Sequence, residues 1–140
     1  MASFVKFQNF VEDLGKGVHD FSTDTLKVYL TNATPSVSLD AVKADLAEIT
    51  AQNGYPAGGT DVTNTWVEAT GTATLDGTNV VFTASGGGAF GPFQYMVLYN
   101  DTPTSPADPL IGYYDYGSSV SVTDPETLTY SITTNIFTLV

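Results

Sequence analysis

Apolar and polar residues alternate along most of this chain, with the period of two that is typical of β-strands. The clearest example is residues 91–117, GPFQYMVLYNDTPTSPADPLIGYYDYG, which predict two strands joined by a proline-rich polar loop. One face of the first strand carries four residues at period two: Phe93, Tyr95, Val97 and Tyr99. Met96 and Leu98 make its other face partly apolar. We therefore expect this strand to be covered on both faces, in the middle of a two-layer structure.

The second strand of this pair contains five large side chains: Leu110, Ile111, Tyr113, Tyr114 and Tyr116. The same kind of pattern predicts further strands at residues 25–32, 66–75, 80–84, 120–122 and 128–140. Asp76-Gly77-Thr78-Asn79 is typical of a hairpin turn, so the strands at 66–75 and 80–84 are expected to pair. Asp124-Pro125 predicts another turn, and the three glycines at 86–88 predict a flexible loop.

The first 14 residues have a different period. Their apolar side chains recur at three- and four-residue spacing, which favours a short amphipathic helix: Phe4, Phe7, Phe10, Val11 and Leu14. Ser3 is placed to cap the start of this helix and Gly15 to end it. An extended N-terminal arm is the alternative.

Residues 39–52 carry the clearest helical pattern in the chain. Four side chains form one apolar stripe: Leu39, Val42, Leu46 and Ile49. Ser38 is the candidate N-cap, and Asn53-Gly54 supplies a stop. We expect this helix to pack one face on a sheet and to leave the charged side chains in water: Lys43, Asp45 and Glu48.

Many short strands at nearly regular spacing, with one or two short helices, predict a mainly β protein. The expected architecture is an antiparallel β-sandwich, and a jelly roll is the favoured form. The 140 residues fit a single domain over 1–140, with residues 1–14 as an N-terminal arm or short helix.

Charge narrows the range of partners. The chain has 15 acidic residues, four lysines and no arginine, for a net charge of −11. Nucleic acids and anionic membranes attract basic proteins, so neither is an expected partner. Only 14% of residues are charged, so much of the surface is neutral and polar, which suits packing against other proteins. The chain has no long apolar segment and begins without a secretory signal, so we expect a soluble protein made in the cytoplasm.

The sequence contains no recognisable reaction centre. His19 is the only histidine, there is no cysteine, and no serine lies in a GxSxG motif. Most acidic residues lie in turns or on the predicted helix faces, where carboxylates stabilise local structure. The glycines at 86–91 do not form a phosphate-binding motif. We therefore expect no enzymatic activity, no cofactor and no metal.

Aromatic residues allow two interpretations. Trp66, Tyr55 and the tyrosines at 113, 114 and 116 could form a stacking platform for sugars, or they could fill the core or an oligomer interface. Strand alternation places Tyr113 and Tyr114 on opposite faces, so both cannot join one platform. The pattern favours the core or an interface.

Several segments resemble virion structural proteins of tailed bacteriophages: NFVEDLGKGVHDF, DTLKVYLTNATP, NGYPAGGT, GPFQYMVLYNDTP and LIGYYDYG. Among these proteins the chain is most similar to jelly-roll capsid cement, or decoration, proteins. The resemblance implies a virion protein, made in the host cytoplasm, that binds the outer surface of the head shell. Its partner would be the major capsid protein, whose neighbouring subunits it would join. The family offers no active-site residues to transfer.

A cement protein is expected to bind through loops and to form homo-oligomers, with a two-fold dimer favoured. The candidate contact segments are residues 1–14, 54–64, 85–92 and 101–109. The candidate interface residues are Phe4, Phe7, Tyr55, Phe90, Tyr114 and Tyr116. Two alternatives remain: a tail or head-fibre component of the same kind of particle, and a carbohydrate-binding or host-adhesion module.

Overall fold

A computed structural model describes residues 3–140 and is mainly β with antiparallel sheets, as the sequence predicts. The first half contains β1 Val5–Lys6, α1 Gln8–Gly15, β2 Leu26–Thr31, a 3₁₀ turn η1 Lys43–Asp45, β3 Thr60–Asp61 and β4 Thr65–Ala69. The second half contains β5 Thr72–Asp76, β6 Val80–Thr83, β7 Ala89–Asn100, β8 Leu110–Thr123, β9 Thr127–Tyr130 and β10 Phe137–Leu139.

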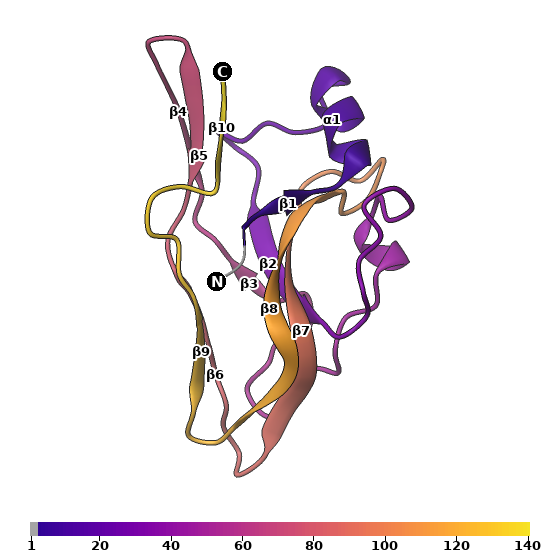
Figure 1. Ribbon diagram of the computed structural model, residues 1–140, viewed down its shortest axis with the longest axis vertical. Coiled ribbons are helices and arrows are strands. Elements are labelled where there is room, and N and C mark those ends of the chain that lie inside the picture. The colour runs from indigo at the N-terminus through magenta and orange to yellow at the C-terminus, as the bar shows by residue number, and fades with distance from the viewer. Residues whose placement is uncertain (1–2) are drawn as a thin grey trace.

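The strands form two layers, as in a β-sandwich. One layer is a five-stranded sheet in the order β1-β8-β7-β2-β3. The other consists of a three-stranded sheet, β10-β5-β4, and a two-stranded sheet, β6-β9. Figure 1 shows these two smaller sheets one above the other, facing the larger sheet. All pairings between strands are antiparallel.

The predicted pair of long strands lies at the centre of the larger sheet. β7 pairs with β8 on one side and with β2 on the other. Residues 95–100 are all buried, so this strand is covered on both faces, as predicted. One detail differs: Phe93 lies on the inner face, opposite to Tyr95 and Val97. The β7–β8 register shifts between Phe93 and Tyr95, and such an irregularity reverses the alternation of side chains.

The core consists of two clusters, one on each face of the larger sheet. The inner cluster fills the space between the layers and includes Leu30, Met96, Ile111, Leu75 and Phe82. The outer cluster lies on the opposite face of the sheet: Phe7, Tyr29, Leu46, Tyr95, Val97, Tyr99 and Leu110. A long segment, residues 41–59, covers the outer cluster, so the sheet has no apolar face open to water (Figure 1).

The N-terminal segment combines both of its predicted forms. Val5 and Lys6 are extended and pair with Tyr113 and Gly112 of β8, and the helix begins only at residue 8. Ser3 is therefore not its N-cap; Phe7 occupies that position. Gly112 makes the extended form possible, because a Cβ there would lie 2.1 Å from the ring of Phe4.

The helix predicted at residues 39–52 is wrong. Only the 3₁₀ turn at Lys43–Asp45 forms, Ser38 caps nothing, and Leu39 is 80% exposed. Carboxylates favour local turns here: Asp40 accepts a hydrogen bond from the Ser36 amide, and Asp45 accepts from the amides of residues 41 and 42. Carbonyl groups that a helix would use internally are bound instead by side chains of β2.

The hairpin predicted at residues 76–79 is also wrong. The strand predicted at 66–75 folds back on itself at Thr70-Gly71, so β4 pairs with β5. β6 lies in the other small sheet, where it pairs with β9. The Thr78 amide and hydroxyl both donate to the Val62 carbonyl. Residues 76–79 therefore bind the loop that contains Val62 and do not close a hairpin.

The predicted strand at 128–140 is two strands in two different sheets. β9 pairs with β6, whereas β10 pairs with β5. The intervening residues cross from one small sheet to the other, and the Ile132 amide is held by the Asn79 side chain at 2.7 Å. β8, in contrast, is longer than predicted and continues without a break to Thr123.

Val97→Asp tests the two-sided burial of β7. Val97 is fully buried in the outer cluster, so an unpaired carboxylate there should destabilise the protein by about 3–5 kcal/mol. Urea denaturation measures this loss. Val67→Asp is the matched control, because Val67 is 61% exposed, and it should change the stability by less than about 0.5 kcal/mol. Equal stability of the two variants would show that the outer face of β7 is not buried.

Candidate functional site

A polar network centred on Glu48 holds the 41–59 segment on the outer face of the large sheet. One Glu48 carboxylate oxygen accepts hydrogen bonds from the Tyr55 hydroxyl and the Gly58 amide, each at 2.7 Å. The other oxygen forms an ion pair with the Lys43 ammonium at 2.7 Å. Both charged side chains are largely buried, with exposed fractions of 21% for Lys43 and 16% for Glu48. The sequence-based expectation that both lie in water is therefore wrong.

Tyrosines connect this network to the sheet. Tyr29 on β2 donates to the Leu46 carbonyl at 2.9 Å, and Tyr99 on β7 donates to the Gly58 carbonyl at 2.7 Å. The Lys43 ammonium lies 4.9 Å from the centre of the Tyr29 ring, where a cation–π attraction operates. Burial raises the pKa of Tyr29 and Tyr99, so both hydroxyls stay protonated and act as donors.

The bonding of Glu48 determines what the network does chemically. Its two oxygens already accept three hydrogen bonds from groups of the same chain. Tyr55 in turn accepts a hydrogen bond from the Leu30 amide at 3.0 Å, which links the network to β2. An open depression of about 300 Å³ is lined by Glu48 together with Gly91 and Pro92. The network therefore holds the 41–59 segment on the large sheet.

His19 belongs to a second polar cluster, between the 16–25 segment and the end of β7. The Asn100 amide nitrogen lies 3.0 Å from His19 Nδ1 and donates to Asp24 at 2.7 Å. Since the Thr102 amide binds the Asn100 carbonyl oxygen, Asn100 is oriented as a donor, and His19 Nδ1 accepts. The imidazole is stacked on Phe21 and its Nε2 is buried without a partner. Burial lowers the pKa of His19, against the opposing effect of Asp13 and Asp24.

The six candidate interface residues are not brought together on one surface. Phe7, Tyr55 and Phe90 are buried in the core of the protein and are not available to a partner. Phe4 and Tyr114 are half-buried, and their tilted rings pack together with centres 5.4 Å apart, on the inner side of β8. Tyr116 is exposed, and its ring packs against Phe93. Only these last three retain any surface.

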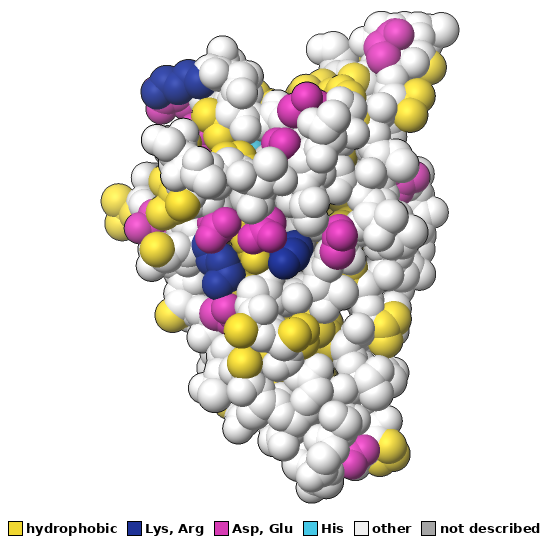
Figure 2. Space-filling view, turned by 180° about the vertical axis from the view of Figure 1, so that it is seen from behind, with side chains coloured by type: hydrophobic (Ala, Val, Ile, Leu, Met, Phe, Trp, Pro, Cys, Tyr) yellow, Lys and Arg dark blue, Asp and Glu magenta, His cyan; other side chains and the backbone are white. Residues whose placement is uncertain are grey.

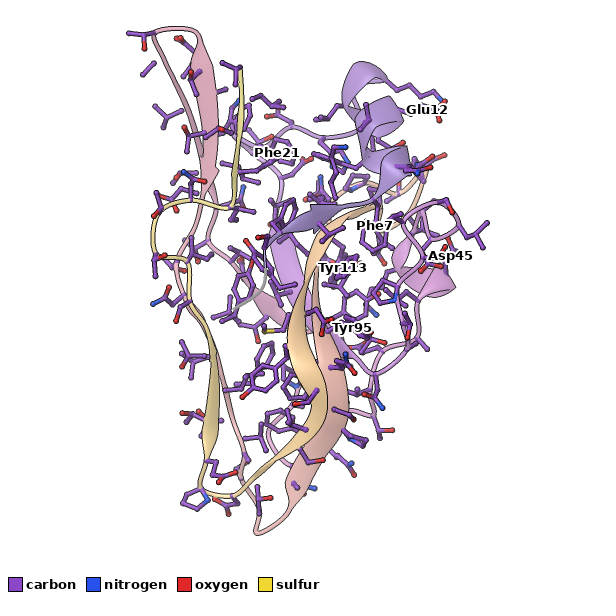
Figure 3. The ribbon with its side chains drawn as sticks, in the orientation of Figure 1. Phe7, Glu12, Phe21, Asp45, Tyr95 and Tyr113 are labelled. Carbon is purple, nitrogen blue, oxygen red and sulfur yellow. The ribbon has the colours of Figure 1, made fainter. Side chains whose placement is uncertain are left out.

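The aromatic residues do not form a sugar platform. Trp66 points inward and packs against Phe21 and Phe137. Tyr113 lies on the outer face, in contact with Phe7 and Tyr95, as Figure 3 shows. Tyr114 lies on the opposite face, beside Tyr130, which confirms the predicted alternation. The structure therefore favours the core interpretation for most of these rings.

The predicted contact segments also lie apart. Residues 85–92 and 101–109 lie at opposite ends of β7, and residues 89–92 belong to that strand. The 101–109 loop contacts the 41–59 segment, where Val42 pairs with Pro109 and the Lys43 amide donates to Asp108. The loop at 85–92 is held to Asn53 and Asp124.

Sequence reasoning missed a groove between the two layers. Its lining comes from both ends of the chain: Phe4, Lys6, Phe10, Phe137, Thr138 and Leu139. The groove has a volume of about 280 Å³ and is mostly apolar. The edge strands β1 and β10 lie on its two sides. The rings of Phe4 and Phe137 pack together with their centres 5.9 Å apart. The sequence shows that Phe137 and Leu139 alternate along one strand face. It does not show that this strand lies beside β1.

Charge on the described surface is sparse and largely paired. Three of the four lysines form ion pairs, with Glu12, Asp101 and Glu48. Figure 2 shows lysines on the back of the molecule beside acidic side chains, with much of the remaining face neutral. Within residues 3–140, no group of three or more His, Asp or Glu side chains is arranged to hold a metal ion. In the same range no helix has the length and apolar character needed to cross a bilayer.

Comparisons with known proteins give no relative. No protein-family model, no curated protein and no solved structure matches this chain.

Glu48→Gln tests whether the polar network around Glu48 stabilises the protein. The amide oxygen can still accept from Tyr55 and Gly58, but the largely buried Lys43 ammonium loses its counter-charge. We expect a loss of about 1–3 kcal/mol in the free energy of unfolding. Glu12→Gln is the control, because the exposed Glu12–Lys16 pair should contribute less than about 0.5 kcal/mol. Equal effects of the two substitutions would contradict the role given to Glu48.

His19 predicts a pH dependence of stability. Because the folded pKa lies below 6.5, the unfolded chain takes up a proton at a higher pH than the folded chain does. The free energy of unfolding should therefore fall as the pH is lowered from about 7 towards 5. Denaturation at several pH values measures the slope, and His19→Gln should flatten it. If the free energy of unfolding of His19→Gln depends on pH as steeply as that of the wild-type chain, carboxylates and not His19 cause the pH dependence.

Proposed function

We propose that this chain is a structural cement, or decoration, protein of a tailed-bacteriophage capsid. In this role it binds the outer surface of the head shell and stabilises contacts between major capsid subunits. The assignment to a phage particle rests on the sequence resemblance described above. The fold supports a binding and structural role through its surface, as follows.

The observation that carries this role is the set of exposed apolar side chains on edge strands. Val5 on β1, Val67 on β4 and Leu139 on β10 are 38%, 61% and 41% exposed. Charges on edge strands usually prevent pairing with other chains, and β10 carries none, whereas β1 and β4 each carry one, Lys6 and Glu68. An exposed sheet edge can accept a strand of another protein, and the aliphatic side chains on these edges would pack against it.

The interior of the protein is consistent with a rigid scaffold. The most buried ion pair and its tyrosines hold a loop on the sheet, and the two core clusters cover both faces of β7. A scaffold of this kind presents fixed edges and loops to a repeating shell. Binding at many equivalent sites lets modest affinity at each contact stabilise the whole particle. The net charge of −11 keeps free copies soluble before assembly.

Deletion of the gene from its phage is the direct test. Purified heads should contain the chain, and heads without it should release their DNA at a lower temperature, because the shell loses its external fasteners. Adding the purified protein to the deficient heads should restore the release temperature. Virions that lack the chain by mass spectrometry would contradict the proposal. Gold-labelled antibody on intact virions separates the head assignment from a tail or fibre position.

A further inference from the structure

The β10 edge has an unusual combination of features. β10 pairs with β5 on one side, and among residues 3–140 no strand pairs with its other side. Its three residues, Phe137, Thr138 and Leu139, carry no charge. Thr138 and Leu139 are exposed, whereas Phe137 points inward and contacts Phe4, Phe10 and Phe21. The free backbone edge therefore lies directly beside the apolar groove.

Side-chain alternation links this edge to the groove. Phe137 and Leu139 lie on the same face of β10, and Thr138 lies on the other. Both Phe137 and the half-exposed Leu139 line the groove, and its far side is formed by Phe4, Lys6 and Phe10. With a volume of about 280 Å³, the groove has room for an additional aliphatic side chain.

We propose that this edge is a homodimer interface, in which β10 of one copy pairs antiparallel with β10 of a second copy. A two-fold axis perpendicular to the sheet, passing near Thr138, keeps the inner faces of both copies on the same side. Phe137 of each copy then lies opposite Leu139 of the other. Leu139 of each copy enters the groove of its partner, and the two three-stranded sheets become one six-stranded sheet.

Charge and the groove together make this edge the better fit for a second copy. Two chains of net charge −11 repel each other, so their approach is least unfavourable where acidic side chains are absent. The outer strands β3 and β4 of the two larger sheets carry Asp61 and Glu68. β1 and β10, the strands at the groove, carry no acidic side chain, and Lys6 is the one lysine without an ion pair among residues 3–140. β6 and β9 also carry no charge, but no residue of either strand lines the groove. Lys6 lowers the repulsion at this place.

This inference does not depend on the capsid assignment. The proposed dimer requires only the purified chain, so failure to observe it leaves the proposed function open to its own test on phage heads. Conversely, a dimer in solution would stand even if the chain were found in another part of a particle.

Cysteine cross-linking tests the pairing directly, because the chain has no cysteine of its own. In the proposed dimer the two copies of Thr138 face each other with Cβ atoms about 4.5–5.5 Å apart, within reach of a disulfide after small adjustment. Thr138→Cys should therefore form a covalent dimer under mild oxidation. Val67→Cys is the matched control on the opposite edge of the same sheet, and it should remain mostly uncross-linked.

Sedimentation equilibrium provides the second measurement. The wild-type chain should show a monomer–dimer equilibrium between about 1 μM and 1 mM. Leu139→Asp should weaken it about tenfold or more, because a charge cannot enter the apolar groove, whereas Val67→Asp should leave it unchanged. Added salt should strengthen the dimer by screening repulsion. A chain that stays monomeric, or equal cross-linking of both cysteine variants, would overturn the proposal and leave the groove to a different protein.

Discussion

The need to cover both faces of β7 determines the rest of the structure. Residues 95–100 are all buried, and their side chains point alternately to the two faces of the large sheet. The two smaller sheets cover the inner face. The outer face, with Tyr29, Tyr95, Val97 and Tyr99, has no second sheet to cover it. An irregular segment must do this, and its backbone polar groups then need partners, since buried unpaired groups are costly.

The polar network around Glu48 meets that need. Tyrosines that belong to the apolar outer cluster also donate hydrogen bonds from their hydroxyl groups to carbonyls of the covering segment. Glu48 binds the segment to itself through Gly58 and Lys43, and Tyr55 extends the connection to β2. The buried charges thus stabilise a loop that has no regular secondary structure of its own. The result is a body with a firmly attached loop. Three of its exposed apolar residues lie on edge strands: Val5, Val67 and Leu139.

The sequence predicted the mainly β class, the β7–β8 pair and the burial of both faces of β7, because period two over a long apolar strand is a strong local signal. It failed at residues 39–52, where the helical spacing of Leu39, Val42 and Leu46 was not decisive. The outcome there depends on tyrosine hydroxyls from β2 and β7, which lie far away in the chain. Pairing errors at 76–79 and 128–140 have the same origin, because exchange between sheets is a tertiary property.

The candidate surface shows the same division. Of the candidate interface residues, Tyr116 is exposed, whereas Phe7, Tyr55 and Phe90 lie in the core. No local signal separates these cases, since an aromatic residue suits an interface and a core equally well. The groove between β1 and β10 joins residues 4–10 to residues 137–139 and so is invisible in any local pattern.

Native-state hydrogen exchange tests most directly whether the 41–59 segment is an integral part of the folded core. The Ile49 amide donates to Leu30, and the Gly58 amide donates to Glu48, so both report on attachment of the segment. If the segment opens only together with the core, these amides exchange with nearly the same free energy of opening as the Val97 amide in β7. Exchange of Ile49 and Gly58 orders of magnitude faster than that of Val97 would show that the segment opens separately, and would contradict it.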